Sequence, residues 1–404
     1  MQISRVLLVL LSLLCTNWAR AADDEFVEDR KFLRVTLDNK TVRLEALIIK
    51  RADAKGKLPV AIIAHGKPNS QGRALDYRAD MYASHLKDFA QRGYLAVVIL
   101  RRGFGSSDSG SQVRVSCKST SLVERFDSDA DELDAALDQV AKRDDADVDR
   151  IIAIGVSAGG AAVTALSTRK TKGLLGVINV SGGLRFQSCP KEDALVDAFK
   201  EFGKKSKIPN LWIYARNDSL FGPDLVGRMQ SAFLDGGADV KLVMLEPGRA
   251  DGHRIFARPD GRIQWLPHMD AFLRQLNLPT WKREDIDSAM EKLGAKDPSR
   301  AFVEGYIWGP SERALAKQKS GTYMYRSFGA RTLDRAREVA LKGCEKKGSS
   351  CEVVMENDRW LSPGDNARPP SEPRRDESRR YDRRRNENRS NKNDRDDRLD
   401  VDDD

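Results

Sequence analysis

The residues with the clearest chemical potential are 155–159, GVSAG, which form a G-x-S-x-G pattern around Ser157. An Ile-rich apolar run, 151–154, precedes the pattern, and small residues compatible with a helix follow it. This context predicts a strand, a sharp turn that lifts the serine hydroxyl off the sheet edge, and a helix. We therefore predict that Ser157 is a nucleophile. The alternative is a glycine-rich strand-to-helix turn in another kind of doubly wound protein.

A serine hydroxyl needs a neighbouring base to accept its proton, and that base needs a carboxylate to orient it. The chain has four histidines. His85 and His268 lie inside predicted helices and are expected to be structural. His65 ends an early predicted strand ahead of the serine, whereas His253 follows the last predicted strand of the main region. His253 is therefore the stronger candidate for the base.

The carboxylate partner should follow a strand between the serine and the base. Asp218 does so, at the end of the segment 211–218, LWIYARND. Asp251 is the rival, but it lies only two residues from His253 and is expected to shape that loop. We predict that Asp218 is the acid. Its alternative role is a helix N-cap or Asx-turn residue ahead of a helix that begins near Pro223.

An oxyanion that develops during attack needs two backbone N–H groups aimed at it. The amide of Ala158, directly after the serine, is the first predicted donor. The second should come from the loop after His65. Lys67 is the candidate there, because Pro68 has no N–H.

Strands and helices must alternate to bring these residues together. Residues 32–50 predict an antiparallel hairpin at a sheet edge, and further strands are predicted at 58–64, 95–100, 151–154, 176–180, 209–214 and 240–245. Helices are predicted at 79–92, 121–142, 191–202, 224–234 and 263–276. This alternation predicts a mostly parallel twisted sheet with helices on both faces. The carboxyl ends of its strands should gather His65, Arg101, Ser157, Ser181 and Asp218 along one edge.

The 404 residues, of which 40% are hydrophobic, allow one large domain and something smaller. We predict a main domain at 22–278 and a small α+β module at 279–361, with helices at 284–293 and 332–344 and strands at 321–328 and 351–355. Residues 362–404 contain Pro, Arg, Asp, Asn and Ser with few apolar residues, so this tail is predicted to be disordered.

The N-terminus has the pattern of a secretory signal peptide, 1–21. Arg5 supplies a positive charge, residues 6–15 are apolar, and Ala19-Arg20-Ala21 is a cleavage site. Cys15 lacks the small preceding residue of a lipoprotein signal. We therefore predict cleavage after Ala21 and a periplasmic or secreted protein, with no other apolar run long enough to cross a membrane.

Four cysteines then remain, namely Cys117, Cys189, Cys344 and Cys351. An even number in an exported protein favours two disulfides, and three pairings are possible. The short spacing between Cys344 and Cys351 favours a local bond, which leaves Cys117 with Cys189. Free buried cysteines are the alternative.

These features together resemble the α/β-hydrolase superfamily, and within it the dienelactone hydrolase-like branch, over residues 42–276. The resemblance is carried by the segments 65–66 (HG), 102–107 (RGFGSS), 155–160 (GVSAGG), 218–223 (DSLFGP) and 251–253 (DGH). It implies an α/β-hydrolase fold in which the base comes last along the chain, as His253 does. True dienelactone hydrolases use a cysteine where this chain has Ser157. The resemblance therefore implies ester hydrolysis through an acyl-serine and puts dienelactone as substrate in doubt.

A small-molecule ester is the expected substrate, and neither a cofactor nor a metal is expected. Phe104, Phe186 and Phe221 are candidates for its pocket, with core packing as the equal alternative. A peptidase or amidase of the same fold is a second hypothesis. A third is a non-catalytic envelope-binding protein built on a hydrolase scaffold. The net charge of +8 is mild and the tail mixes both signs, so no nucleic-acid partner is expected, and the partner of the 279–361 module is unknown.

Overall fold

A computed structural model describes residues 25–68, 74–109, 115–185, 192–248 and 250–362. The predicted signal peptide, the tail from residue 363 onward, and the residues Cys15, Phe186 and Cys189 lie outside the described residues. Among those described, no helix combines the length and the apolar composition that a membrane span requires.

The larger part of the protein is built on one eight-stranded sheet with the order β1-β2-β4-β3-β5-β6-β7-β8. The first two strands form the predicted edge hairpin, and β2 also pairs antiparallel with β4, whereas all other neighbours are parallel. The strands are β1 (Phe26–Leu37), β2 (Lys40–Arg51), β3 (Leu58–Ala64), β4 (Leu95–Ile99), β5 (Ala146–Val156), β6 (Leu174–Val180), β7 (Asn210–Ala215) and β8 (Val240–Leu245).

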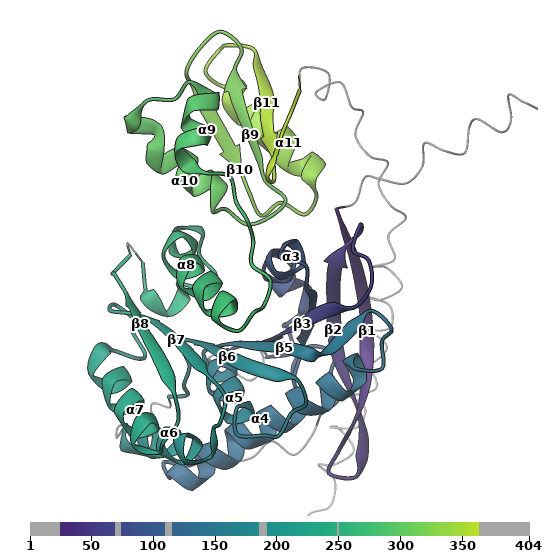
Figure 1. Cartoon of the computed structure of the whole chain (residues 1–404), viewed down its shortest axis with the longest axis vertical. Helices are drawn as coiled ribbons and strands as arrows, with labels where there is room; N and C mark the ends of the chain where they lie inside the picture. The colour runs from purple at the N-terminus through teal and green to yellow at the C-terminus, as the bar shows by residue number, and fades with distance from the viewer. Residues whose placement is uncertain (1–24, 69–73, 110–114, 186–191, 249, 363–404) are drawn as a thin grey trace, which may run out of the picture.

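Helices cover both faces of this sheet, as predicted (Figure 1). One face carries α3 (Ala83–Gln91) and α8 (Pro259–Gln275), and the other carries α4 (Ser119–Val140), α5 (Ala158–Leu166), α6 (Asp193–Lys205) and α7 (Pro223–Asp235). Strand β3 shows why the sequence forms these layers. Its residues Val60 and Ile62 enter one hydrophobic core, and the alternate residues Ala61 and Ile63 enter the other. A strand buried on both faces therefore reads as a continuous apolar run.

The C-terminal part has its own antiparallel sheet with the order β10-β9-β11-β12. Its strands are β9 (Ala314–Gln318), β10 (Met324–Ser327), β11 (Cys351–Glu356) and β12 (Arg359–Trp360). Helices α9 (Ile286–Leu293) and α10 (Arg300–Ile307) contribute to the hydrophobic cluster that includes Leu315, and α11 (Leu333–Glu345) contributes to the cluster that includes Ala316. The predicted α+β character is therefore present, with α10, β9 and β12 as additional elements.

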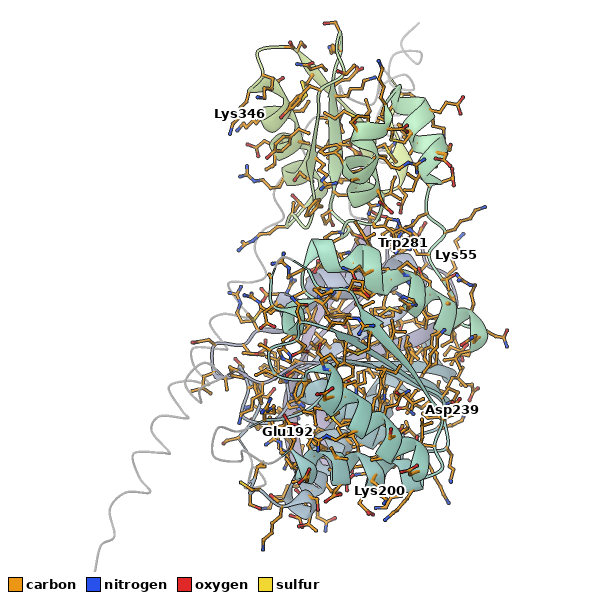
Figure 2. The ribbon with its side chains drawn as sticks, turned by 90° about the vertical axis from the view of Figure 1, so that its left-hand side faces the viewer. Lys55, Glu192, Lys200, Asp239, Trp281 and Lys346 are labelled. Atoms are coloured by element: carbon orange, nitrogen blue, oxygen red, sulfur yellow. A yellow bond between two sulfur atoms is a disulfide. The ribbon has the colours of Figure 1, made fainter. Side chains whose placement is uncertain are left out.

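Buried charges and tryptophans join the two parts. Trp281 lies between the upper and lower parts in Figure 2, and its Nε1 donates a hydrogen bond to Asp358 at 2.7 Å. The Arg262 Nε of α8 donates to the Trp308 carbonyl at 3.0 Å. Lys87 of α3 donates to Glu312 at 2.8 Å. These contacts fix the smaller part against the α3 and α8 side of the large sheet.

Candidate active site

Ser157 stands at the sharp turn between β5 and α5. Its backbone has φ 55° and ψ −124°, a conformation that costs energy for a residue with a side chain. The flanking glycines make the turn possible. A Cβ at Gly155 would lie 2.0 Å from the Gly159 carbonyl oxygen, and one at Gly159 would lie 2.2 Å from the Ala64 carbonyl oxygen. Only glycine at both positions lets the strand, the helix and the end of β3 approach this closely.

His253 reaches Ser157 from a short 3₁₀ turn, Gly252–Arg254, that follows β8. Its Nε2 lies 3.1 Å from the Ser157 Oγ, which is hydrogen-bond distance. The side chain of His253 is 17% exposed, so the imidazole is shielded but open to a small reactant. The structure thus brings the predicted nucleophile and the predicted base into contact across 96 residues of sequence.

Asp218 lies on the far side of the same imidazole. Its two carboxylate oxygens are 3.1 Å and 3.2 Å from the His253 Nδ1, and its side chain is fully buried. A carboxylate only accepts hydrogen bonds, so Nδ1 carries the proton and Nε2 presents its lone pair to Ser157. Asp218 Oδ1 also accepts from the amides of Leu220 and Phe221 at 2.9 Å and 3.0 Å. The alternative Asx-turn role is therefore present together with the contact to His253.

Asp251 shapes the loop that bears His253, as the sequence analysis expected. Its Oδ1 accepts from the backbone amides of His253 and Ser219, both at 3.0 Å. Its Oδ2 accepts from the Ser219 hydroxyl at 2.8 Å. Asp251 therefore ties the loop of the base to the loop of the acid, while the contact to the imidazole itself comes from Asp218.

Asn217 is a second tie between these loops, and the sequence analysis missed it. Its side-chain nitrogen donates to the carbonyls of Ala250 and Gly248 at 2.8 Å and 3.3 Å, and its backbone carbonyl accepts from the Gly252 amide at 3.1 Å. The available signal was a polar residue two positions after the buried strand β7.

The predicted oxyanion donors lie on either side of Ser157. Ala158 is the first residue of α5, so its amide faces outward at the helix N-terminus, where no preceding turn accepts it. On the other side, a Cβ at Gly66 would lie 3.3 Å from the Ser157 Cβ, so the loop that carries Lys67 runs directly past the serine. Burial, with the Arg125 charge nearby, lowers the pKa of the Lys67 ammonium. The assignment of the Lys67 amide as a donor stays a prediction.

Two residues at the end of β6 complete the backbone around the serine. The Ser157 amide donates to the Val180 carbonyl at 3.0 Å, and the Gly183 amide donates to the Ser157 carbonyl at 3.1 Å. Ser181 lies between them with φ 47° and is buried. The end of β6 thus holds the turn from the side opposite to β3.

The other histidines have structural surroundings. His65 is fully buried, and burial, reinforced by the Arg101 charge, lowers its pKa far below the usual value. His85 stacks on Phe256 at a ring distance of 4.2 Å, and burial lowers the pKa of His85 to about 4. Burial also lowers the pKa of His268, which lies in α8. Among the described residues, no group of His, Cys, Asp and Glu has an arrangement that could hold a metal ion.

The described aromatic candidates are both packed into the interior. Phe104 is 2% exposed and contacts the His65 ring edge-on at a centroid distance of 4.4 Å. Phe221 is 1% exposed and lies 5.5 Å from the His253 ring. They therefore pack behind the reactive groups, and this packing is the clearer of the two roles that the sequence left open.

The disulfide prediction is confirmed at one pair. Cys344, in α11, is bonded to Cys351, at the start of β11. Cys117 is also disulfide-bonded, and its predicted partner, Cys189, lies outside the described residues.

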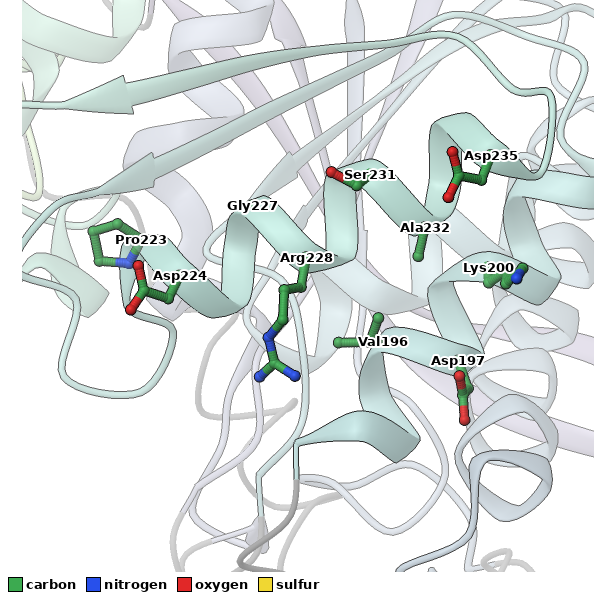
Figure 3. A pocket seen from close by; sticks show the side chains of 10 residues that line it. All are labelled: Val196, Asp197, Lys200, Pro223, Asp224, Gly227, Arg228, Ser231, Ala232 and Asp235. Carbon is green, nitrogen blue, oxygen red and sulfur yellow. The ribbon is translucent and has the colours of Figure 1, made fainter.

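A groove of about 680 Å³ runs between α6 and α7 (Figure 3). It is lined by Val196, Asp197, Lys200, Pro223, Asp224, Gly227, Arg228, Ser231, Ala232 and Asp235. Arg228 is already paired with Glu192 and Asp193 at 2.6 Å and 2.9 Å. The groove is thus a surface feature of two helices, and neither Ser157 nor His253 lines it.

A family model matches part of the chain, and several solved structures are similar to it. The model of a family described as serine aminopeptidase, S33, matches residues 75–217. The chain is similar to a protein assigned as a dienelactone hydrolase from Klebsiella pneumoniae, with 19% identity over 62% of this chain and 100% of that chain and a TM-score of 0.44. No curated protein matches the chain.

Of two further solved structures that are similar to the chain, one is named an esterase and the other a peptidase. The chain is similar to the esterase Pf2001 from Pyrococcus furiosus, with 17% identity over 61% of this chain and 90% of that chain and a TM-score of 0.43. It is also similar to an acylaminoacyl peptidase from Pyrococcus horikoshii, with 20% identity over 65% of this chain, 44% of that chain and a TM-score of 0.45. The strand order and the family match together confirm the predicted α/β-hydrolase fold.

Proposed function

We propose that this chain, a serine hydrolase with the α/β-hydrolase fold, cleaves carboxylic esters through an acyl-serine intermediate. One observation carries the proposal. Ser157, His253 and Asp218 form a continuous line of contacts, with 3.1 Å from the serine to the imidazole and 3.1 Å from the imidazole to the carboxylate. Three side chains from separate loops in this order are what an activated serine requires.

The first half of the reaction forms the acyl-enzyme. Ser157 Oγ attacks the ester carbonyl carbon while His253 Nε2 takes the serine proton. The buried Asp218 stabilises the imidazolium that results. The amides of Ala158 and Lys67 donate to the oxyanion. When the C–O bond breaks, His253 returns the proton to the departing alcohol.

The second half regenerates the enzyme. Water attacks the acyl-serine carbonyl, and His253 takes one proton from that water. Collapse of the second oxyanion releases the carboxylic acid and returns the proton to Ser157. Every step uses groups of this chain and water, so the proposed reaction needs no cofactor.

We further propose that the enzyme works in the periplasm or is secreted, after removal of 1–21. The sequence pattern of that segment is the main support. The bond between Cys344 and Cys351 agrees with an oxidising compartment. Cleavage after Ala21 is testable by N-terminal sequencing of protein recovered outside the cytoplasm.

A peptidase or amidase activity is the second candidate, and the name of the matched family favours it. The two candidates share the nucleophile and differ in the leaving group. An amine is a poorer leaving group than an alcohol and depends more on protonation by His253. A non-catalytic envelope-binding protein is the third candidate, and it has no need of all three contacts.

The test is a matched substrate series. Wild type, Ser157→Ala and His253→Ala are assayed on p-nitrophenyl acetate and butyrate and on the p-nitroanilides of alanine and leucine. The proposal expects ester turnover that both variants lose. Faster turnover of the anilides would favour the peptidase, and no turnover of either series by folded wild type would contradict the proposed function.

A further inference from the structure

Arg101 is a buried cation. The hydrogen bonds of its guanidinium go to the start of the loop that carries Lys67 and to Asp129. The residue follows β4 and is 1% exposed. Its Nη2 donates to the His65 carbonyl at 2.5 Å and lies 3.5 Å from the Gly66 carbonyl oxygen. Its Nη1 donates to Asp129 of α4 at 2.9 Å, and Asp129 is 3% exposed. A carboxylate partner of this kind offsets the cost of burying the guanidinium charge.

Arg101 also fixes the state of the His65 side chain. The Arg101 backbone amide donates to the His65 Nε2 at 3.0 Å, so that nitrogen is the acceptor. The proton must then be on Nδ1, which lies 2.7 Å from the Gly66 carbonyl oxygen and donates to it. The imidazole therefore folds back over its own loop and is locked as one neutral tautomer.

These bonds determine where the next amide points. The Gly66 carbonyl and the Lys67 N–H belong to the same peptide unit, which is planar and trans, so the two groups point in opposite directions. The carbonyl is held by the His65 Nδ1 and faces the Arg101 side. The Lys67 N–H is thereby directed away from that buried cluster.

The same peptide lies against the serine. A Cβ at Gly66 would be 3.3 Å from the Ser157 Cβ and 3.4 Å from the Val156 carbonyl oxygen. A Cβ at Gly159 would be 2.6 Å from the His65 carbonyl oxygen, the atom that Arg101 holds. The loop is therefore clamped between α5 and the Arg101 guanidinium, at the point where it passes Ser157.

We propose that Arg101 is a positioning residue for the oxyanion hole. Through its contacts with His65 and the Gly66 carbonyl, it orients the Gly66–Lys67 peptide so that the Lys67 amide meets the substrate oxygen. This inference rests on the proposed function and deepens it. Arg101 touches no reacting atom. Its effect is to hold one donor in the orientation that the tetrahedral intermediate requires.

The test separates an oxyanion effect from a loss of structure by changing the substrate atom. Arg101→Met would leave Asp129 buried with a weaker partner, so the main variant is Arg101→Met combined with Asp129→Asn. The substrates are p-nitrophenyl acetate and its thiono analogue, in which C=S replaces C=O. Sulfur accepts hydrogen bonds weakly, so the thionoester gains little from oxyanion donors even in wild type.

Two variants serve as controls. Arg102→Met removes the neighbouring arginine, whose Nε donates to the buried Glu132 at 2.8 Å, and so reports the cost of losing a comparable charge pair. Arg101→Lys keeps the charge but cannot make the forked contact to His65 and Asp129 together. Circular dichroism and melting temperature are recorded for every variant.

The expected result is a loss of roughly 100-fold in kcat on the oxoester with a nearly unchanged KM. The thionoester rate falls much less, Arg102→Met keeps the wild-type ratio of the two rates, and Arg101→Lys does not restore it. Equal losses on both esters, or no loss, in a folded variant would overturn the inference while the proposed function stands. Wild type that leaves the oxoester intact would instead remove the proposed function and this inference with it.

Discussion

At the scale of single residues, the site depends on side chains that perform two tasks at once. Asp218 orients the base and closes the turn ahead of α7, because its Oδ1 accepts from Leu220 and Phe221 as well as facing His253. Asp251 binds the His253 backbone and the Ser219 hydroxyl instead of the imidazole. Asp218 thus orients the His253 ring, and Asp251 holds the loop that bears it.

This division predicts unequal effects for two matched substitutions. Asp218→Asn presents an amide that can turn its N–H toward the His253 Nδ1 and so stabilise the wrong tautomer. We expect kcat on p-nitrophenyl acetate to fall by about 10⁴-fold, as it does when the triad aspartate of a serine protease is replaced by asparagine. Asp251→Asn should cost much less, because it loosens a loop and leaves the tautomer unchanged. A larger loss in Asp251→Asn would reverse the assignment of the acid.

Much of the residue-scale picture could be predicted from the sequence, because each candidate lies in a segment that follows an apolar run. Ser157, Asp218 and His253 were placed in this way, and the described structure brings them into contact. Arg101 and Asn217 also follow apolar runs, yet their roles could not be predicted. Arg101 turns back on a residue 36 positions earlier, and Asn217 binds carbonyls 31 and 33 positions later. The spacing of residue types along the sequence does not indicate hydrogen bonds between residues this far apart.

At the scale of elements, the turn around Ser157 depends on glycines that admit backbone where a side chain would collide. Gly159→Ala would place a methyl group 2.2 Å from the Ala64 carbonyl oxygen, so β3 and α5 would have to separate. We expect a lower melting temperature and a large loss of activity. Gly227→Ala is the matched control in α7, where a Cβ would meet nothing within 4 Å, and it should stabilise by up to about 1 kcal/mol. Equal melting temperatures for the two variants would contradict this account of the turn.

The junction between β2 and β5 supplies a pH-dependent prediction. Asp145, just before β5, accepts from Arg143 at 2.8 Å and 3.0 Å and from Lys50 at 2.9 Å. The hydrogen bonds from Arg143 lower the pKa of Asp145 to about 2. A carboxyl whose folded pKa is depressed adds stability above its unfolded pKa, near 4, and loses that contribution as the pH falls toward 2.

We therefore expect Asp145→Asn to reduce the free energy of unfolding by about 1 kcal/mol at pH 6, a value that allows for solvent screening. The difference from wild type should shrink between pH 4 and pH 2. Urea titrations at pH 6, 4 and 3 measure it. A difference that stays constant across this range would contradict the assignment.

The elements of the C-terminal part are the ones that the sequence pattern predicts least well. Residues of β9, ALAKQ, form a central strand of the second sheet although they are short and rich in alanine. Their strand character comes from pairing with β10 and β11 and from burial of Leu315 and Ala316 between two sets of helices. Tertiary packing of this kind overrides intrinsic preference, so it could not be predicted from the segment alone.

At the scale of the whole molecule, the two sheets are joined by buried ion pairs instead of a bare linker. Asp270 of α8 accepts from Arg92 at 2.9 Å and from Arg283 at 2.9 Å, and Arg283 precedes the second sheet. The Arg283 guanidinium lies 4.3 Å and 4.4 Å from the Trp281 and Trp308 ring centroids. Burial lowers the pKa of Arg283 to about 10, so this cation remains charged at neutral pH.

This junction predicts that the two parts unfold together. Asp270→Ala would leave two buried arginines without their carboxylate and should cost about 3–5 kcal/mol. Urea unfolding followed by tryptophan fluorescence and by far-ultraviolet circular dichroism should give one shared transition in wild type, and Asp239→Ala, at an exposed position, should leave it unchanged. Two separate transitions in wild type would contradict the coupling.

The central claim is that Ser157 is an activated nucleophile. The most direct measurement is covalent labelling of the 22–404 protein with a fluorophosphonate, followed by mass spectrometry of the labelled peptide. The account predicts one adduct on Ser157 in wild type, none in Ser157→Ala, and strongly slowed labelling in His253→Ala. A folded wild-type protein that remains unlabelled, or that carries the adduct on another residue, would contradict it.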